Sequence, residues 1–318
     1  MDKKDLRIIY MGTPDFAVES LKALHENGYN IVGVITMPDK PAGRGHKIQF
    51  SPVKQYALDN NLRLLQPEKL KNEAFLAELK SLQADLQIVV AFRMLPEVVW
   101  DMPRLGTFNL HASLLPQYRG AAPINWAVIN GDTETGATTF FLTHEIDTGN
   151  IILQEKLPIA KTDTAGDVHD RLMLLGSGLV LKTVDQILSG NVQVKPQSQN
   201  DTLKTAPKIF KETCRMDWTK TATELYNFVR GLSPSPTAWT EITLPSGETL
   251  GLKIYETEKA FGQHNLSAGT LLTDNKTFIK IATSDGYLHL LSVQLAGKKQ
   301  MKVDELLRGY KVDGSHLL

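Results

Sequence analysis

The sequence predicts an α/β protein with a Rossmann-like, doubly wound and mostly parallel sheet, followed by a smaller β-barrel domain. Apolar runs rich in Val and Ile alternate with helical segments over residues 1–190, an order typical of parallel sheets. Residues 191–207 are polar and show no sustained period, which is typical of a linker. Residues 208–318 change to short apolar runs divided by turn signals. We therefore expect a first domain at 1–190, a linker at 191–207 and a second domain at 208–318.

The elements of the first domain follow from hydrophobic periodicity. Apolar, β-rich segments predict strands, and apolar residues at helical spacing predict helices. The expected strands are 7–11, 31–36, 62–65, 86–91, 105–111 and 137–142. The expected helices are 17–26, 53–60, 72–79, 124–130 and 165–189.

The second domain is expected to contain two helices and five short strands. The helices are 223–229 and 303–308, and the strands are 238–243, 251–257, 270–272, 278–282 and 287–293. Five short strands separated by turn residues predict a small barrel.

Composition limits the class of protein. A chain of 318 residues with 42% hydrophobic residues can bury a substantial core, and its length suggests about two domains. No signal or transit segment is recognisable, and no apolar run approaches the roughly 20 residues of a membrane span. The single cysteine, Cys214, excludes an intramolecular disulfide, and the histidines lack metal-ligand spacing. We expect a cytoplasmic protein without a metal site.

The formal net charge of zero argues against a protein that coats nucleic acid through charge alone. One segment is nevertheless basic: Lys40, Arg44, Lys47 and Lys54 stand against Asp39 alone. Its prolines and glycines predict a loop, and a basic loop suits contact with phosphates, although composition favours a solvated surface loop. A second cluster, Lys298, Lys299 and Lys302, precedes the last helix and has the same two interpretations.

Asn109, His111 and Asp147 are the candidate catalytic residues. Asn109 and His111 are two apart on a predicted strand, so their side chains share a face. Asp147 follows the next predicted strand. Because ligands of open parallel sheets bind outside the carboxyl ends of strands, we expect all three residues at that edge.

These three side chains suit acyl transfer from one nitrogen to another. Asn109 offers an N–H to a tetrahedral oxyanion, His111 can carry a proton near neutral pH, and Asp147 can orient the imidazole. Taken singly, Asn109 could cap a turn, His111 could be a buried histidine with satisfied hydrogen bonds, and Asp147 could form a local turn. A nicotinamide enzyme is disfavoured, since the first turn, Gly12-Thr13-Pro14, lacks the G-x-G-x-x-G spacing.

The chain resembles the folate-dependent formyltransferases. The resemblance rests on Asn109-x-His111-x-Ser113-Leu114-Leu115-Pro116, then Arg119-Gly120-Ala121-Ala122-Pro123 and Asp147-Thr148-Gly149. It extends to Met11–Phe16 and Pro38–Gly45, and so covers nearly the whole chain. It implies an OB-fold-like second domain. It also implies transfer of the formyl group of 10-formyltetrahydrofolate, a co-substrate, to the α-amino group of methionyl initiator tRNA by direct attack.

The resemblance also implies binding residues. For folate they are Ser113, Leu114, Leu115, Pro116, Val90, Phe92 and Leu95. For tRNA they are Arg44, Lys40, Lys47, Lys298 and Lys299. The sequence departs from the family at Arg93, where an Ala-Tyr-Gly run is common, and at Ala112, where glycine is common.

Other functions remain open from the sequence. A sugar-nucleotide N-formyltransferase would share the catalytic residues without needing the basic loop. A non-catalytic RNA-binding protein would not need the three catalytic residues, and resemblance to a glycinamide ribonucleotide formyltransferase would stop near the end of the first domain. We expect a monomer with tRNA as its partner, with no protein partner and no membrane.

Overall fold

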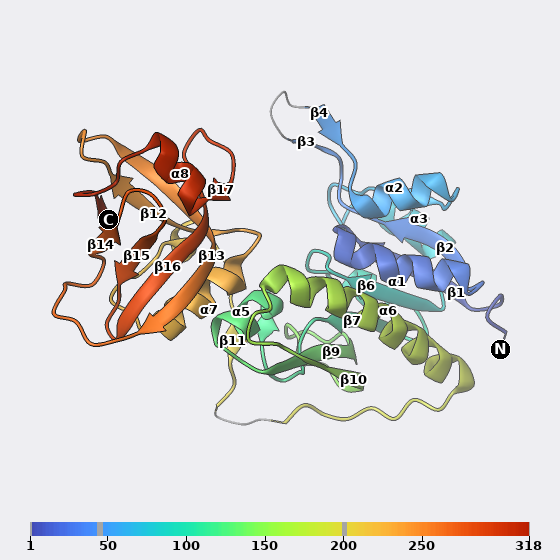
Figure 1. Ribbon diagram of the computed structural model, residues 1–318. Helices are drawn as coiled ribbons and strands as arrows, with labels where there is room; N and C mark the ends of the chain where they lie inside the picture. Colours follow the sequence, from blue (N-terminus) through green and yellow to red (C-terminus); the bar gives the residue numbers. More distant parts are fainter. Residues whose placement is uncertain (1, 43–46, 199–201, 318) are drawn as a thin grey trace. The chain divides into compact units, whose positions relative to one another are not determined.

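The computed structural model describes residues 2–42, 47–198 and 202–317, which form two compact units (Figure 1). The first unit comprises Met1–Gly120, Thr135–Leu157 and His169–Thr205. The second comprises Ala121–Glu134, Pro158–Val168 and Ala206–Leu318. Two segments from the predicted first domain thus cluster with the C-terminal residues. The linear division at 190 and 207 remains a prediction about the domains of the chain.

The first unit is built on a seven-stranded sheet in the order β10-β9-β7-β6-β1-β2-β5. The strands are β1 (Arg7–Gly12), β2 (Asn30–Ile35), β5 (Leu64–Leu65), β6 (Leu86–Val90), β7 (Thr107–His111), β9 (Glu134–Phe141) and β10 (Ile151–Pro158). The pairs β1 with β2, β1 with β6, β2 with β5 and β6 with β7 are parallel. β9 runs antiparallel to β7. The predicted mostly parallel sheet is confirmed.

Helices cover both faces of this sheet. They are α1 (Asp15–Glu26), α2 (Pro52–Asp59), α3 (Glu73–Ser81), α4 (Glu97–Trp100) and α6 (Ala165–Ser189). α1 and α6 lie on the same side in Figure 1, and the Tyr10 hydroxyl of β1 donates to the Ala17 carbonyl of α1. Ile9 of β1 packs on the opposite side with Phe75 of α3 and Val99 of α4. Alternate side chains of the strands therefore serve two cores, as the doubly wound fold requires.

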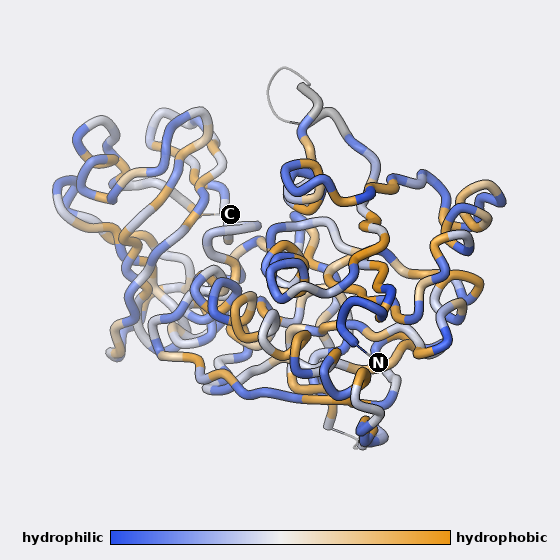
Figure 2. The backbone as a smooth tube through the Cα atoms, turned by 90° about the vertical axis from the view of Figure 1, so that its right-hand side faces the viewer, coloured by the Kyte–Doolittle hydropathy of each residue, from blue (hydrophilic) through white to orange (hydrophobic). Residues whose placement is uncertain are grey.

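The hydropathy of the helices agrees with their position on the two faces of the sheet. Along the helices, the tube of Figure 2 alternates between hydrophobic and hydrophilic residues. Such alternation is typical of helices that bury one face.

The basic segment contains a hairpin, so its prediction as a loop is wrong. β3 (Lys40–Ala42) pairs antiparallel with β4 (Lys47–Gln49). Pro41 is compatible with this pairing because β3 has a partner on one side only, within a two-stranded sheet. Residues 43–46 lie outside the described residues, and the residues on either side of them form paired strands that the prolines and glycines did not indicate.

Of the described helices, α6 is the one long and apolar enough to cross a membrane by length and composition alone. The expectation that no segment approaches a membrane span is therefore too strong on those criteria. In the structure α6 packs on the sheet: a Cβ on Gly176 would lie 2.8 Å from Leu110 Cδ2, and the hydroxyls of Thr183 and Thr139 are 2.8 Å apart. This packing accounts for its apolar residues.

The second unit contains an antiparallel sheet in the order β14-β15-β16-β13-β12-β18, with β17 paired to β16. Its strands are β12 (Ala238–Thr243), β13 (Thr249–Phe261), β14 (Leu271–Thr273), β15 (Ile279–Ala282), β16 (Gly286–Leu295), β17 (Met301–Lys302) and β18 (His316–Leu317). The register between β13 and β16 shifts near Glu256, and such bulges bend a strand and help a sheet to curl. The predicted OB-fold-like architecture is confirmed, with β17 and β18 as additional short strands.

The remaining short elements complete the chain. They are β8 (Arg119–Gly120), α5 (Pro123–Ile129), β11 (Thr205–Ala206), the 3-10 helix η1 (Glu212–Cys214), α7 (Ala222–Leu232) and α8 (Val303–Gly309). Leu225, Val229 and Leu232 of α7 are buried in the core of the second unit with Leu288 of β16. Cys214 is a free thiol buried in the same core.

Candidate active site

Asn109 and His111 lie at the end of β7 and share a face, as their spacing predicts. Asn109 pairs with Val89 of β6 on one side and with Phe140 of β9 on the other, which fixes the backbone beneath both residues. His111 is buried, and Asn109 is half-buried. Among the described residues, the Asn109 side-chain amide has no hydrogen-bond partner, so its N–H groups are available to a substrate.

Asp147 reaches the site by a different route from the one expected. Because β9 is antiparallel to β7, its last residue, Phe141, pairs with Phe108 near the start of β7. The expectation that Asp147 follows a strand ending at the same edge as β7 is therefore wrong. The loop after β9 returns the carboxylate to His111 instead, with 3.8 Å between Asp147 Oδ2 and His111 Nδ1.

Glycines permit this loop. An added Cβ on Gly149 would lie 1.7 Å from the Phe141 carbonyl oxygen, so no larger residue fits there without movement of the backbone. The backbone N–H of Gly120, a residue with φ of +126°, donates to Asp147 Oδ2 at 2.9 Å. Asp147 itself has φ of +55°, a left-handed conformation that costs a non-glycine residue about 1 kcal/mol. Contacts around the loop therefore hold Asp147 in an unfavourable conformation.

The imidazole of His111 is oriented by a backbone carbonyl. Nε2 lies 2.8 Å from the carbonyl oxygen of Tyr118. Because a carbonyl can only accept, Nε2 carries the hydrogen and Nδ1 of the neutral ring has the free lone pair. Nδ1 faces Asp147 at a separation too long for a strong hydrogen bond but short enough for charge attraction. Nδ1 is thus the nitrogen that can take up a proton.

The Ser113–Pro116 segment is held by internal hydrogen bonds. The buried Ser113 hydroxyl donates to the Gln117 carbonyl at 2.6 Å, and Gln154 Nε2 donates to the Leu115 carbonyl at 2.8 Å. Leu115 packs with Phe140 in a small core. The structure therefore gives Ser113 and Leu115 a role in shaping the loop, while folate contact by Ser113, Leu114, Leu115 and Pro116 stays a prediction.

The other residues predicted to contact folate lie mainly in the core. Val90 ends β6 and is fully buried, and Leu95 and Phe92 pack in the core beside α3 and α4. Arg93, where the sequence departs from the family pattern, donates to the carbonyls of Pro67 and Glu68. Burial lowers the pKa of its guanidinium. Arg93 thus ties two loops together, and folate contact by Val90, Phe92 and Leu95 stays a prediction.

The residues predicted to bind tRNA are only partly described. Arg44 lies outside the described residues, and of Lys40 and Lys47 only the strand pairing of their backbones is described. Lys54, counted in the same basic segment, is buried and pairs with Asp39 at 2.5 Å. The excess positive charge of the hairpin therefore resides in Lys40, Arg44 and Lys47. Lys298 and Lys299 are exposed in the turn between β16 and β17.

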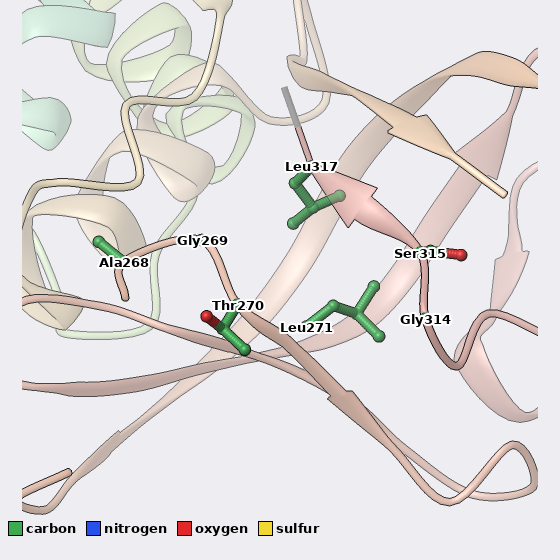
Figure 3. A pocket seen from close by; sticks show the side chains of 7 residues that line it. All are labelled: Ala268, Gly269, Thr270, Leu271, Gly314, Ser315 and Leu317. Carbon is green, nitrogen blue, oxygen red and sulfur yellow. The ribbon is translucent and has the colours of Figure 1, made fainter. Parts of the chain in front are cut away.

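Within the described residues, no group of three or more His, Cys, Asp or Glu residues could hold a metal ion. A pocket of about 400 Å³ lies in the second unit (Figure 3). Its lining residues are Ala268, Gly269, Thr270, Leu271, Gly314, Ser315 and Leu317. None of these is charged, and the Ser315 hydroxyl points away from Leu271 and Leu317 in Figure 3.

Sequence reasoning missed three contributors to the site. The Tyr118 carbonyl orients His111, the Gly120 N–H holds Asp147, and the Gln197 side chain binds the loop that carries Asp147. Of these three, only Gly120 could have been suspected from the sequence, since a glycine between larger residues suggests an unusual backbone conformation. A main-chain carbonyl has no sequence signature, and Gln197 stands in a polar segment without a motif.

Comparison with known proteins matches both parts of the chain. The family model described as formyl transferase matches residues 6–184, and the model described as formyl transferase, C-terminal domain, matches residues 208–311. A methionyl-tRNA formyltransferase of Bacteroides thetaiotaomicron is 66% identical over 321 residues and covers 99% of both chains. One of Flavobacterium johnsoniae is 58% identical over 304 residues and covers 96% of both chains.

Solved structures support the fold. The sugar 3N-formyl transferase WlaRD, determined in the presence of dTDP and 5-N-formyl-THF, has a TM-score of 0.64 at 22% identity. The match covers 92% of this chain and 99% of that one. HypX from Aquifex aeolicus in complex with tetrahydrofolic acid has a TM-score of 0.63 at 18% identity, covering 95% of this chain and 46% of that one. With both family models and close full-length relatives in agreement with the geometry around His111, we conclude that this chain belongs to the formyl transferase family.

Proposed function

We propose that this protein transfers the formyl group of 10-formyltetrahydrofolate to the α-amino group of methionyl initiator tRNA. The observation that carries the proposal is the approach of Asp147 to His111 Nδ1 beside the unpaired amide of Asn109. His111 and Asn109 provide a base and an oxyanion donor on one face of β7, and Asp147 provides a stabilising carboxylate from the loop after β9. The protein acts as a monomer in the cytoplasm and needs no metal for this chemistry.

The reaction proceeds by direct attack. The neutral α-amine of the aminoacyl-tRNA adds to the formyl carbon, and the new C–N bond gives a tetrahedral intermediate. The Asn109 N–H donates to the oxyanion, and a donor of this kind contributes about 3 to 4 kcal/mol to transition-state stabilisation. No covalent bond to the protein forms, since none of the three side chains acts as a nucleophile.

His111 moves the proton between the two nitrogens. Its Nδ1 accepts a proton from the attacking nitrogen, and the imidazolium formed is stabilised by Asp147 at 3.8 Å. Nδ1 then returns the proton to N10 of the folate as the bond from the formyl carbon to N10 breaks. The Tyr118 carbonyl keeps its hydrogen bond to Nε2 throughout, so the ring need not turn. The sum of these steps leaves His111 neutral and ready for another turnover.

The choice of acceptor rests on the full-length relatives and the basic residues. Relatives at 58–66% identity that span nearly the whole chain are methionyl-tRNA formyltransferases. The sugar N-formyltransferase among the solved structures is 22% identical and supports the fold alone. Lys40, Arg44 and Lys47 of the hairpin and Lys298 and Lys299 of the second unit suit contact with tRNA phosphates.

The test offers the purified protein 10-formyltetrahydrofolate with charged initiator methionyl-tRNA and, in parallel, with an amino-sugar nucleotide. We expect N-formylmethionyl-tRNA and no formylated sugar, measured by mass spectrometry of the products. Formylation of the sugar alone would overturn the proposed acceptor.

Asp147→Asn tests the proposed role of the carboxylate. The amide oxygen can keep the hydrogen bond from Gly120, but it carries no charge to stabilise the imidazolium. We expect kcat to fall by about 10²- to 10⁴-fold with an unchanged melting temperature, and His111→Ala to lose at least as much. Single-turnover formylation and thermal unfolding measure the two effects. Turnover near that of wild type in either variant would contradict the mechanism.

A further inference from the structure

The linker after α6 is attached to the candidate active site at several points. Lys195 and Ile151 of β10 exchange two backbone hydrogen bonds of 2.8 Å. Gln197 reaches the loop that carries Asp147, and the Lys204 carbonyl accepts from the backbone N–H of Tyr118 at 2.7 Å. These contacts all lie within the first unit. The linker is therefore held by hydrogen bonds to the segments that carry or flank the candidate catalytic residues.

Gln197 uses both ends of its side-chain amide. Nε2 donates to the carbonyl oxygen of Asp147 at 2.8 Å and to that of Gly149 at 2.9 Å. Oε1 accepts from Arg119 Nε at 3.0 Å and Arg119 Nη2 at 2.6 Å. The orientation of the amide is unambiguous, because carbonyls only accept and a guanidinium only donates. Gln197 thus links Arg119 to the catalytic loop.

Gln197 binds the backbone of a turn in which Asp147 has an unfavourable conformation. Asp147 has a left-handed φ of +55°, and in this conformation its carboxylate lies 3.8 Å from His111 Nδ1. The hydrogen bonds to the carbonyls of Asp147 and Gly149 restrain the peptide groups of this turn. Arg119, adjacent to the Gly120 whose N–H binds the Asp147 carboxylate, fixes the other end of the amide.

We propose that Gln197 is a positioning residue for formyl transfer: it holds the backbone of Asp147 so that the carboxylate faces His111. This inference rests on the proposed function of His111 and Asp147. Gln197 touches neither the imidazole nor the carboxylate in the structure, so its effect passes through Asp147. Part of the predicted linker thereby becomes part of the catalytic machinery.

The test replaces Gln197 by Met, which has a similar length and neither amide hydrogen-bond end. We expect kcat for formylation of methionyl-tRNA to fall by about 10- to 100-fold, because displacement of a catalytic group by about 1 Å has an effect of that size. KM for both substrates should change less than twofold. Gln193→Met is the matched control, since Gln193 is exposed on the same linker and has no side-chain hydrogen bond among the described residues.

Two further variants separate positioning from a general structural effect. Gln197→Glu keeps an acceptor for Arg119 but replaces the donor with an oxygen that repels the two carbonyls, so it should lose as much kcat as Gln197→Met. In the Asp147→Asn background, Gln197→Met should cause no further loss, because its effect passes through the carboxylate. Activity of Gln197→Glu near that of wild type, or a full additional loss in the double variant, would overturn the inference.

The wild-type measurement separates this inference from the proposed function. If the wild-type protein does not formylate methionyl-tRNA, the proposed function fails. If it does and Gln197→Met turns over normally, only the positioning role of Gln197 fails. The melting temperature of each variant is measured beside the kinetics. If Gln197→Met has a lowered melting temperature, Gln197→Glu takes its place in this comparison.

Discussion

Gly149 is the residue whose size limits the catalytic loop most directly. Alanine at this position would bring its Cβ within 1.7 Å of the Phe141 carbonyl, a backbone atom that cannot rotate away. We expect Gly149→Ala to destabilise the fold by about 1–3 kcal/mol, as overpacking does, and to abolish most formyl transfer by displacing Asp147. Urea unfolding and formylation assays measure the two effects.

Gly178→Ala is the matched control for this prediction. Gly178 lies within α6, and an added Cβ there would have no heavy atom within 4 Å apart from its chain neighbours and the backbone of its own helix. Because alanine is favoured over glycine in a helix, this change should raise stability by about 0.5–1 kcal/mol and leave turnover unchanged. If Gly149→Ala and Gly178→Ala had the same stability and the same turnover, the close approach of residue 149 to the Phe141 carbonyl would have no effect on the fold or on catalysis.

Residue spacing predicted part of the site. Asn109 and His111 were found from a period of two on one strand, a property that depends only on local backbone geometry. Asp147 was named by motif, but its approach to His111 depends on a loop that returns across the site. The Tyr118 carbonyl and Gln197 were not predictable, because their contacts are set by distant backbone rather than by neighbours in sequence.

The hairpin β3–β4 is joined to helix α2 by an ion pair at its base. Asp39 precedes β3 and binds Lys54 of α2 at 2.5 Å, and Gln66 Nε2 donates to the same carboxylate at 3.0 Å. Hydrogen bonds from Lys54 and then from Gln66 hold the pKa of the Asp39 carboxyl below its ordinary value. These contacts fix where the hairpin leaves the sheet.

Asp39→Asn tests the ion pair between Asp39 and Lys54 through the pH dependence of the free energy of unfolding. A carboxyl whose folded pKa is depressed stabilises the fold above its unfolded pKa of about 4 and loses this contribution as pH falls through the folded value. The variant should therefore be less stable than wild type at pH 7, and the difference should shrink below about pH 4. Urea unfolding of both proteins at pH 7 and pH 3 measures this difference in the free energy of unfolding. A difference that is the same at both pH values would show that the charge of Asp39 contributes nothing.

Element boundaries were predicted well where periodicity was long and poorly where it was short. The 25-residue α6 has the predicted bounds because its apolar face repeats over many turns. The direction of β9 was not predictable, since apolar runs of similar composition form parallel or antiparallel pairs. The loop predicted around Pro41 is a hairpin because pairing between its two short strands prevails over local turn signals.

At the scale of the whole molecule, contacts within the second unit join segments distant in sequence. Asn125 of α5 donates to the Gly231 carbonyl of α7 at 2.8 Å, and Trp126 Nε1 donates to the Pro207 carbonyl at 2.8 Å. A Cβ on Gly231 would lie 2.8 Å from the Ile129 backbone nitrogen, so the two helices pack closely. A cut near residue 207 would therefore remove α5 from its partners.

The distribution of charge leads to a prediction about tRNA. The chain has no net charge, so attraction of tRNA must come from local clusters such as Lys298 and Lys299. If Lys298 and Lys299 bind tRNA phosphates as proposed, replacing both by alanine should lower kcat/KM for tRNA, because two charged contacts would be lost. The slope of log kcat/KM against log salt should become less steep by about 1.5. Steady-state kinetics between roughly 50 and 200 mM salt measure the slope.

Lys69→Ala with Lys71→Ala is the charge-matched control, since both lysines are exposed and neither is predicted to bind tRNA. KM for the folate should be unchanged in both double variants. An equal change of slope in the control would mean that overall charge, rather than contact at Lys298 and Lys299, governs tRNA binding.

The sequence by itself predicted the alternation of strands and helices in the first unit, although not strand β10, and it predicted the two-part architecture and named Asn109 and His111 as candidate catalytic residues. These follow from periodicity and motifs, which act over a few residues. The tertiary structure decided how Asp147 reaches His111, which ring nitrogen of His111 faces the Tyr118 carbonyl, and that α5 packs with the C-terminal residues. It also brought Gln197 from the linker to the catalytic loop. The physical reason is that each of these outcomes depends on hydrogen bonds and steric limits between backbone segments that only the folded chain brings together.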